Sequence, residues 1–299
     1  MNLTEEFTSR VTGAFGEAGA KWIANLSQIV ETAVTRWSLT LESPFEPLAY
    51  NYVAPATGAD GVQLVLKSGV PCRELNTEIA ALRHWNGAGA VRLIEADCDN
   101  GLLLLERAEP GTPLFEVPDD DEATKVFAAV ARELHKPPPA KHNFPTIADW
   151  ARGFARIRST SSGFPQQHLE RAAAMMEELI GSMNDVGVLH GDLHHWNILA
   201  AKRQPWLAID PKGVIGEPEY EVGAWLRNPA PQIYSDPELK PKTRRRIDII
   251  ADELGFSKQR LADWCYCQAV LSAVWSYEEG QAGFKAALNY AEQLSALPL

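Results

Sequence analysis

The feature that most constrains the fold of this chain is a change in the spacing of apolar and turn residues near residue 108. Before this point, short apolar or alternating runs between turn residues predict β-strands, and helical spacing of apolar residues predicts intervening helices. The predicted strands are 37–41, 50–53, 62–67, 91–96 and 102–105, with one or two helices over 3–36 and another over 71–85. The Asp60-Gly61 pair, which precedes 62–67, indicates a hairpin turn.

After Glu109-Pro110-Gly111 the pattern becomes mainly helical. A β-rich island over 188–209 interrupts helices predicted at 119–135, 146–159, 166–186, 219–227, 236–254, 258–277 and 281–294. A chain of 299 residues is long enough for two lobes, since single cores stop growing at about 250–300 residues. The sequence therefore predicts an α+β fold with a β-rich lobe over 1–108 and a mainly helical lobe over 109–299.

Charge and cysteine content exclude several classes of protein. The chain has 28 Lys and Arg against 39 Asp and Glu, a net charge of −11, which argues against a nucleic-acid partner and is compatible with cationic small molecules. The first residues are acidic and no apolar run approaches the length of a membrane span, so we expect a cytoplasmic protein without a membrane partner. The four cysteines lack metal-ligand spacing and are expected to be reduced. The sequence gives no indication of oligomeric state.

The most specific segment is 188–199, which reads VLHGDLHHWNIL. Its frame, His-x-Asp-Leu-x-x-x-Asn, has the spacing of the kinase catalytic loop, in which the aspartate accepts the proton of the substrate hydroxyl and the asparagine binds Mg²⁺. Asp192 and Asn197 occupy these positions. An apolar strand then ends at Asp210, 18 residues after Asp192, where a second oxygen ligand would complete a Mg²⁺ site with ATP phosphates.

These segments, with AIDPKGVIGEPEYE at 208–221 and LRNP at 226–229, resemble the aminoglycoside phosphotransferase superfamily. More narrowly, the chain is similar to the family of streptomycin and hydroxyurea phosphotransferases, over most of its length. The resemblance implies a bilobal fold like that of eukaryotic protein kinases. It also implies transfer of a phosphoryl group from ATP or GTP, with Mg²⁺, to a hydroxyl of a small polar molecule such as an aminoglycoside or hydroxyurea.

The resemblance also assigns nucleotide-binding residues in the first lobe. Lys67 ends a predicted strand where the family places the lysine that contacts the α- and β-phosphates. Its carboxylate partner should lie on the following helix, where Glu74 and Glu78 share one face; we favour Glu78.

The segment 102–108 resembles the hinge between lobes, so the backbone of Glu106, Arg107 and Ala108 is expected to bind adenine. The loop over 44–52, which should cover the phosphates, contains no glycine. Asn51 could instead supply a side-chain donor.

After the metal carboxylate, Glu217, Glu219 and Glu221 are expected to lie over the acceptor site. Glu217 and Glu221 stand where the family commonly has aspartates, which leaves the role of Glu221 in helix capping open. His190 is expected to organise the catalytic loop.

Two other functions fit parts of the sequence. A protein kinase is disfavoured because Tyr220 follows Asp210 within ten residues, which leaves no room for a long activation loop. A nucleotide-binding module without kinase activity would agree with the glycine-free loop. It would have no chemical need for the set of Lys67, Asp192, Asn197 and Asp210. A kinase of an unrelated metabolite also stays open.

Overall fold

The structure is a computed structural model that describes residues 3–160, 163–280 and 283–297. The chain divides into two compact units, Met1–Gly111 and Thr112–Leu299. The change of apolar spacing near residue 108 lies close to this division. Each unit has its own hydrophobic core and is described separately below.

The first unit is built on a five-stranded antiparallel sheet with the strand order β1-β2-β3-β5-β4. Its elements are α1 (Glu5–Trp37), β1 (Thr40–Leu41), β2 (Tyr52–Thr57), β3 (Gln63–Ser68), α2 (Arg73–Trp85), β4 (Leu93–Asp97) and β5 (Leu102–Glu106). The predicted hairpin at Asp60-Gly61 is confirmed, because β2 pairs with β3 from Thr57 opposite Gln63 to Tyr52 opposite Ser68. The strand expected at 37–41 is shorter, since Trp37 still belongs to α1.

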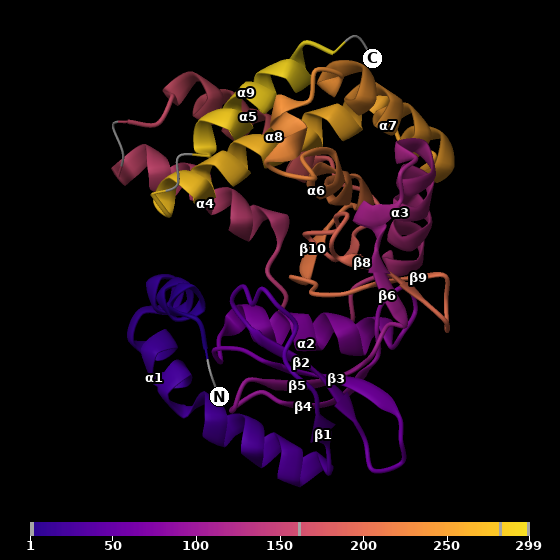
Figure 1. The fold of residues 1–299 in the computed structure, drawn as a ribbon. Coiled ribbons are helices and arrows are strands. Elements are labelled where there is room, and N and C mark those ends of the chain that lie inside the picture. The colour runs from indigo at the N-terminus through magenta and orange to yellow at the C-terminus, as the bar shows by residue number, and fades with distance from the viewer. Residues whose placement is uncertain (1–2, 161–162, 281–282, 298–299) are drawn as a thin grey trace. The chain divides into compact units, whose positions relative to one another are not determined.

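Helices α1 and α2 lie on opposite faces of this sheet (Figure 1). Successive side chains on a strand point to opposite faces of the sheet. On one face, Ala54 of β2, Leu66 of β3 and Leu102 of β5 join Trp22 and Leu26 of α1 in one buried cluster. The next residue along β3, Lys67, therefore faces the other way, toward α2. Helix α1 is interrupted at Gly16, whose backbone is not helical, so two helical parts occupy the segment 3–36, where the sequence predicted one or two helices.

The second unit surrounds one long buried helix, α8 (Lys258–Glu278). Buried side chains occur on all sides of α8, because α4 (Ile147–Thr160), α5 (Gln166–Gly181), α6 (Val222–Leu226), α7 (Leu239–Leu254) and α9 (Phe284–Ser295) pack around it. The helix α3 (Asp120–Leu134) packs on α7 (Figure 1). The predicted helix at 281–294 begins outside the described residues, at 281 and 282. The helix predicted to reach 186 ends at Gly181.

Short strands carry the segment that contains Asp192. They are β7 (Gly187–Leu189), β8 (Ile198–Ala201), β9 (Trp206–Ala208) and β10 (Val214–Gly216), while β6 (Pro110–Pro113) spans the division between the units. Strand β7 pairs with β10 and β8 pairs with β9, both antiparallel. The described residues also form three short 3₁₀ helices, η1 (Leu114–Glu116), η2 (Pro218–Glu221) and η3 (Gln232–Ser235). The first turn of the helix predicted at 219–227 is therefore a 3₁₀ turn, followed by α6.

Among the described residues, no helix combines the length and the apolar character needed to cross a bilayer. The four cysteines, all within the described chain, are free thiols, as expected.

The turn between β4 and β5 requires glycine at position 101. Gly101 has φ +67°, and a Cβ there would lie 2.0 Å from the carbonyl oxygen of Gly69. We expect Gly101→Ala to lower the free energy of unfolding by more than the roughly 1–3 kcal/mol of backbone strain alone. Gly61→Ala is the matched control, because Gly61 has φ +81° but open space around it. Urea denaturation of both variants checks this, and equal losses would contradict it.

Candidate active site

In the first unit, Lys67 and Glu78 form a buried ion pair. Lys67 Nζ donates to both carboxylate oxygens of Glu78, at 2.7 and 2.8 Å. The side chains are 2% and 8% exposed, so the pair is held in a low-dielectric environment between β3 and α2. Of the two carboxylates that the sequence offered, the structure pairs Lys67 with Glu78, 11 residues away, in agreement with the favoured choice.

The strand β5 ends in the segment expected to bind adenine. The backbone N–H of Glu106 donates to Arg92 O at 2.9 Å, and that of Arg107 donates to Gln63 O at 3.4 Å. The Arg107 guanidinium contacts Glu42 and Gln63, so its side chain is engaged within the sheet. In the described part of the chain, the Ala108 N–H donates to no other group. Among these three residues, it is the backbone donor available to a ligand.

Asn51 lies immediately before β2, in the loop without glycine. A Cβ at Gly69 would come within 2.3 Å of Asn51 Oδ1, so the missing side chain at Gly69 makes room for the Asn51 amide. The glycine that accommodates this loop therefore stands at the end of β3 rather than in the loop itself. The role of Asn51 toward phosphate stays a prediction.

In the second unit, the loop between β7 and β8 presents Asp192 and fixes Asn197. Asn197 Nδ2 donates to the backbone oxygen of Asp192 at 2.9 Å, and the Asn197 N–H donates to His194 O at 2.9 Å. The loop is thus closed on itself over the four residues that lie between Asp192 and Asn197. The Asn197 side-chain nitrogen donates to Asp192 O, so the side-chain oxygen of Asn197 takes no part in that hydrogen bond.

Asp210 is placed next to Asn197 by backbone pairing. The N–H of Ile209 donates to Asn197 O at 2.9 Å, one residue before Asp210. Asp210 itself is exposed and has φ +58°, which turns the chain sharply at the end of the β8–β9 pair. The sequence-predicted oxygen ligands therefore lie on adjoining segments of one unit.

The backbone of the loop before Asp192 is held by a carboxylate. Glu221 accepts hydrogen bonds from the N–H groups of His190 at 2.6 Å, Gly191 at 2.9 Å and Leu193 at 3.4 Å. Glu221 is 4% exposed, and burial raises the pKa of its carboxyl to about 7, although the three N–H donors favour the ionised form. Glu221 thus supports the backbone of the loop that carries Asp192.

Glu217 is also structural. It is 1% exposed and accepts from Arg260 Nη2 at 2.8 Å, from the Asn184 N–H at 3.2 Å and from the Trp264 indole. With its carboxylate buried in this way, Glu217 does not face an acceptor. The extra methylene relative to aspartate lets both Glu217 and Glu221 reach backbone and side-chain donors on other elements.

An arginine and a histidine lie beside the Asp192 carboxylate. Arg227 Nη2 donates to Oδ1 at 3.2 Å, and His194 Nε2 lies 3.6 Å from Oδ2. Burial raises the pKa of Asp192, but the hydrogen bond and charge of His194 and the charges of Arg227 and Lys212 outweigh it, so the net pKa is well below the ordinary value. Asp192 is therefore an anionic acceptor at neutral pH.

Two histidines of the loop are buried and neutral. His190 Nε2 lies 2.7 Å from Ile209 O, and its Nδ1 accepts from the Asp192 N–H at 3.2 Å, so His190 organises the loop as expected. The His195 ring stacks on Trp225, with 3.7 Å between ring centroids and 6° between ring planes. Arg246 Nη2 lies 3.2 Å from His195 Nε2. Burial lowers the pKa of His190 to about 4, and burial with the charge of Arg246 lowers that of His195 to about 2.

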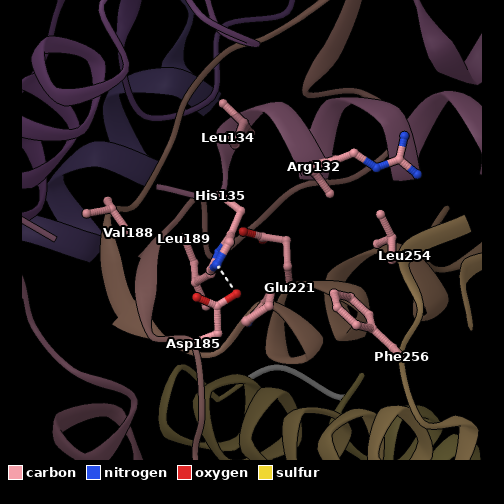
Figure 2. Close-up of a pocket in the computed structure, with 11 residues that line it drawn as sticks. Arg132, Leu134, His135, Asp185, Val188, Leu189, Glu221, Leu254 and Phe256 are labelled. Carbon is pink, nitrogen blue, oxygen red and sulfur yellow. Dashed lines mark hydrogen bonds and ion pairs between the residues drawn. The ribbon is translucent and has the colours of Figure 1, made fainter. Parts of the chain in front are cut away.

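Glu221 also lines a cavity of about 170 Å³ (Figure 2). Figure 2 shows Leu134, Leu254 and Phe256 around it, and the His135–Asp185 pair, 3.0 Å between Nε2 and Oδ2, at one side. Its lining is mainly apolar. Within the described chain, the cavity is lined by neither Asp192 nor the two predicted metal ligands, so it is separate from the candidate active site.

Sequence reasoning missed the contributions of three residues to this site. Arg227 was noted only as part of a matching segment, and nothing in its spacing, 35 residues from Asp192, could indicate the ion pair. The part that Glu221 plays could have been suspected from its position after Tyr220, where the family commonly has an aspartate. His194 is the third, since its Nε2 lies 3.6 Å from Asp192 Oδ2.

The buried Lys67–Glu78 pair makes a prediction about stability. Lys67→Met should lower the free energy of unfolding of the first unit by about 3–5 kcal/mol, because it leaves the Glu78 carboxylate buried without its cation. The double change Lys67→Met and Glu78→Leu should recover much of this loss. Arg36→Met, which breaks an exposed pair with Asp97, is the control and should cost about 0–1 kcal/mol. Chemical denaturation measures all three, and a double variant no more stable than Lys67→Met would count against the argument.

The buried neutral histidines make a prediction about pH. Below pH 6.5 the unfolded chain binds protons that native His195 and His190 do not bind, so the free energy of unfolding should fall as the pH is lowered. His195→Gln should reduce the slope between about pH 5 and 6 by roughly 1.4 kcal/mol per pH unit, the value for one proton. Urea denaturation across this range measures the slope. His142→Gln, at an exposed position, is the control. An identical slope in His195→Gln and the wild type would contradict this account.

Comparison with known proteins places the chain in a family. Residues 36–280 match the aminoglycoside/hydroxyurea antibiotic resistance kinase family. Streptomycin 6-kinase of Streptomyces glaucescens is 33% identical over 300 residues, 98% of this chain and 97% of that protein. Hydroxyurea phosphotransferase of Kitasatospora aureofaciens is 31% identical over 272 residues, 89% of this chain and 77% of that protein.

Among solved structures, choline kinase LicA from Streptococcus pneumoniae superposes with a TM-score of 0.62 at 14% identity, covering 91% of this chain and 99% of that chain. This likeness confirms the predicted α+β fold of the protein-kinase type. With the sequence match over most of its length, the chain belongs to the aminoglycoside/hydroxyurea antibiotic resistance kinase family and is an ATP-dependent small-molecule phosphotransferase.

Proposed function

We propose that this protein transfers the γ-phosphoryl group of Mg²⁺-ATP to a hydroxyl of a streptomycin-like aminoglycoside. The observation that carries the proposal is the loop 190–197, which presents an anionic Asp192 and holds the Asn197 amide by a hydrogen bond to the Asp192 backbone oxygen. The similarity to streptomycin 6-kinase, over nearly the whole of both chains, supports the acceptor class. The net charge of −11 is compatible with a cationic acceptor.

In this proposal, Asp192 orients the acceptor hydroxyl and takes its proton. A bond forms between the acceptor oxygen and the γ-phosphorus, the bond to the β,γ-bridging oxygen breaks, and ADP leaves. Most of the catalysis is alignment and charge neutralisation, since the protein forms no covalent bond. A carboxylate held anionic by His194, Arg227 and Lys212 is suited to orienting the hydroxyl.

The residues of the second unit fit a magnesium ion. Mg²⁺ prefers oxygen ligands, and the Asn197 amide oxygen and the Asp210 carboxylate are hard donors on adjoining segments. When bound, the ion would neutralise charge on the phosphates of the nucleotide. The chain's own contribution is to hold these two donors through the Asn197–Asp192 and Ile209–Asn197 hydrogen bonds.

The first unit supplies the nucleotide contacts in this proposal. Lys67, oriented by Glu78, contacts the α- and β-phosphates. The hinge segment Glu106–Ala108 binds adenine through its backbone, with Ala108 N–H as the donor, and Asn51 contributes a polar group near the phosphates. Because the hinge acts through its backbone, GTP is a second candidate donor.

The similarity to hydroxyurea phosphotransferase supports hydroxyurea as a second acceptor. The test measures ADP and GDP release with Mg²⁺ over a panel of streptomycin, other aminoglycosides, hydroxyurea and small polyols. Mass spectrometry of the product detects the added phosphate, and NMR locates the hydroxyl. Turnover with streptomycin is the expected result. Turnover only with hydroxyurea, or with no member of the panel, would overturn the proposed acceptor.

Asp192→Ala should lower the turnover number by about 10²–10⁴-fold without a change in the circular dichroism spectrum, because it removes the group that orients and deprotonates the hydroxyl. Asp252→Ala, at an exposed position of the same unit, is the matched control and should keep full turnover. Steady-state kinetics with the best acceptor of the panel measures both variants. Full activity of a folded Asp192→Ala variant would remove Asp192 from the proposed mechanism.

A further inference from the structure

Arg227, the first residue after α6, joins the candidate base to the helical core. Its side chain is 12% exposed, and its guanidinium contacts two acceptors: Nη2 donates to Asp192 Oδ1 at 3.2 Å, while Nη1 donates to Gln268 Oε1. The two contacts lie on different elements, the catalytic loop and the buried helix α8. A planar guanidinium that bridges two acceptors is restricted in orientation far more than a single ammonium group would be.

The anchor of this guanidinium, Gln268, is itself fixed. Gln268 is 4% exposed, and its Nε2 donates to Tyr220 O at 2.6 Å, so its amide oxygen is turned toward Arg227. Space for the Gln268 side chain exists because residue 223 is glycine: a Cβ there would come within 2.5–2.9 Å of three Gln268 atoms. A continuous series of hydrogen bonds therefore links the Tyr220 backbone oxygen, through Gln268 and Arg227, to the Asp192 carboxylate.

This chain of contacts has two consequences for Asp192. It fixes the carboxylate through Oδ1, so that Oδ2, which faces His194 across 3.6 Å, is left at a defined position. It also places a permanent positive charge beside a carboxylate that must approach a phosphoryl group in the proposed reaction. Without that charge, the two anions would repel each other in a partly buried site.

We propose that Arg227 is a positioning residue for phosphoryl transfer, which acts by fixing Asp192 Oδ1 and leaving Oδ2 to receive the acceptor hydroxyl. The inference rests on the proposed function of Asp192. Arg227 makes its contribution through the carboxylate and its Gln268 anchor rather than by binding the acceptor. It should therefore influence the turnover number more than the KM for either substrate.

The first test compares variants that remove the positive charge of Arg227, its ability to contact Asp192 and Gln268 together, or the Gln268 amide. Arg227→Met should lower kcat by about 10–100-fold with little change in the KM values, the scale expected when a supporting group is lost. Arg227→Lys keeps the charge but cannot bridge both partners, so an intermediate loss is expected. Gln268→Leu removes only the anchor and should also lower kcat. Arg152→Ala, at an exposed arginine of the same unit, is the control and should be unchanged.

The second test asks whether Arg227 acts through Asp192. In an Asp192→Asn background, adding Arg227→Met should have little further effect on kcat, because the carboxylate that Arg227 positions is already gone. Full additivity of the two losses would overturn the inference. Guanidinium chloride well below its denaturing range should partly restore kcat to Arg227→Ala, with equal NaCl as the ionic-strength control. A loss caused only by misfolding would not be restored, so failure of this rescue would also count against the proposal.

The outcomes separate this inference from the proposed function. If the wild type releases ADP in response to an acceptor and Arg227→Met has full kcat while folded, the inference fails and the proposed function stands. If the wild type transfers phosphate to no acceptor of the panel, the proposed function fails first. Thermal melting of each variant shows whether a lost kcat comes with a lost fold.

Discussion

The candidate active site of the second unit depends on one interaction, the acceptance of three backbone N–H groups by the Glu221 carboxylate. A loop that projects a reactive aspartate cannot satisfy all of its own N–H groups in a strand or helix, and leaving them buried without acceptors would be costly. Glu221 satisfies His190, Gly191 and Leu193 together. Backbone flanking Asp192 on both sides is therefore set by a residue from η2, outside the loop.

The side chain of Asp192 is set by a different group from the same region of the chain. Glu221 belongs to η2 and Arg227 follows α6, so one short segment holds both the loop's backbone and the side chain that it presents. This segment is in turn packed on α8, the helix with buried side chains on all sides. Catalytic geometry in this unit is thus tied to the core that also determines its stability.

The sequence predicted the parts of the fold and site that depend on local pattern. The β-rich first unit, the hairpin before Lys67 and the order of Asp192, Asn197 and Asp210 follow from periodicity or fixed spacing. The Lys67–Glu78 pair was expected from the family resemblance, because helical spacing alone left Glu74 and Glu78 as equal candidates. Contacts between distant segments could not be predicted, because no local pattern reports them. The Arg227–Asp192 ion pair is one such contact, and the burial of Glu217 and Glu221 is another; these two glutamates were expected to face an acceptor.

The close approach of Gly223 to Gln268 also limits how this family member can diverge. A larger residue at 223 is acceptable only where position 268 has already become smaller, and a smaller residue at 268 releases Arg227 from its anchor. A larger residue at 223 and a smaller residue at 268 would be tolerated together. Alone, the first would clash with Gln268, and the second would remove the contact that holds Arg227. Drift at these positions should therefore be correlated, and a homologue with a side chain at 223 should carry a rebuilt support for its catalytic aspartate.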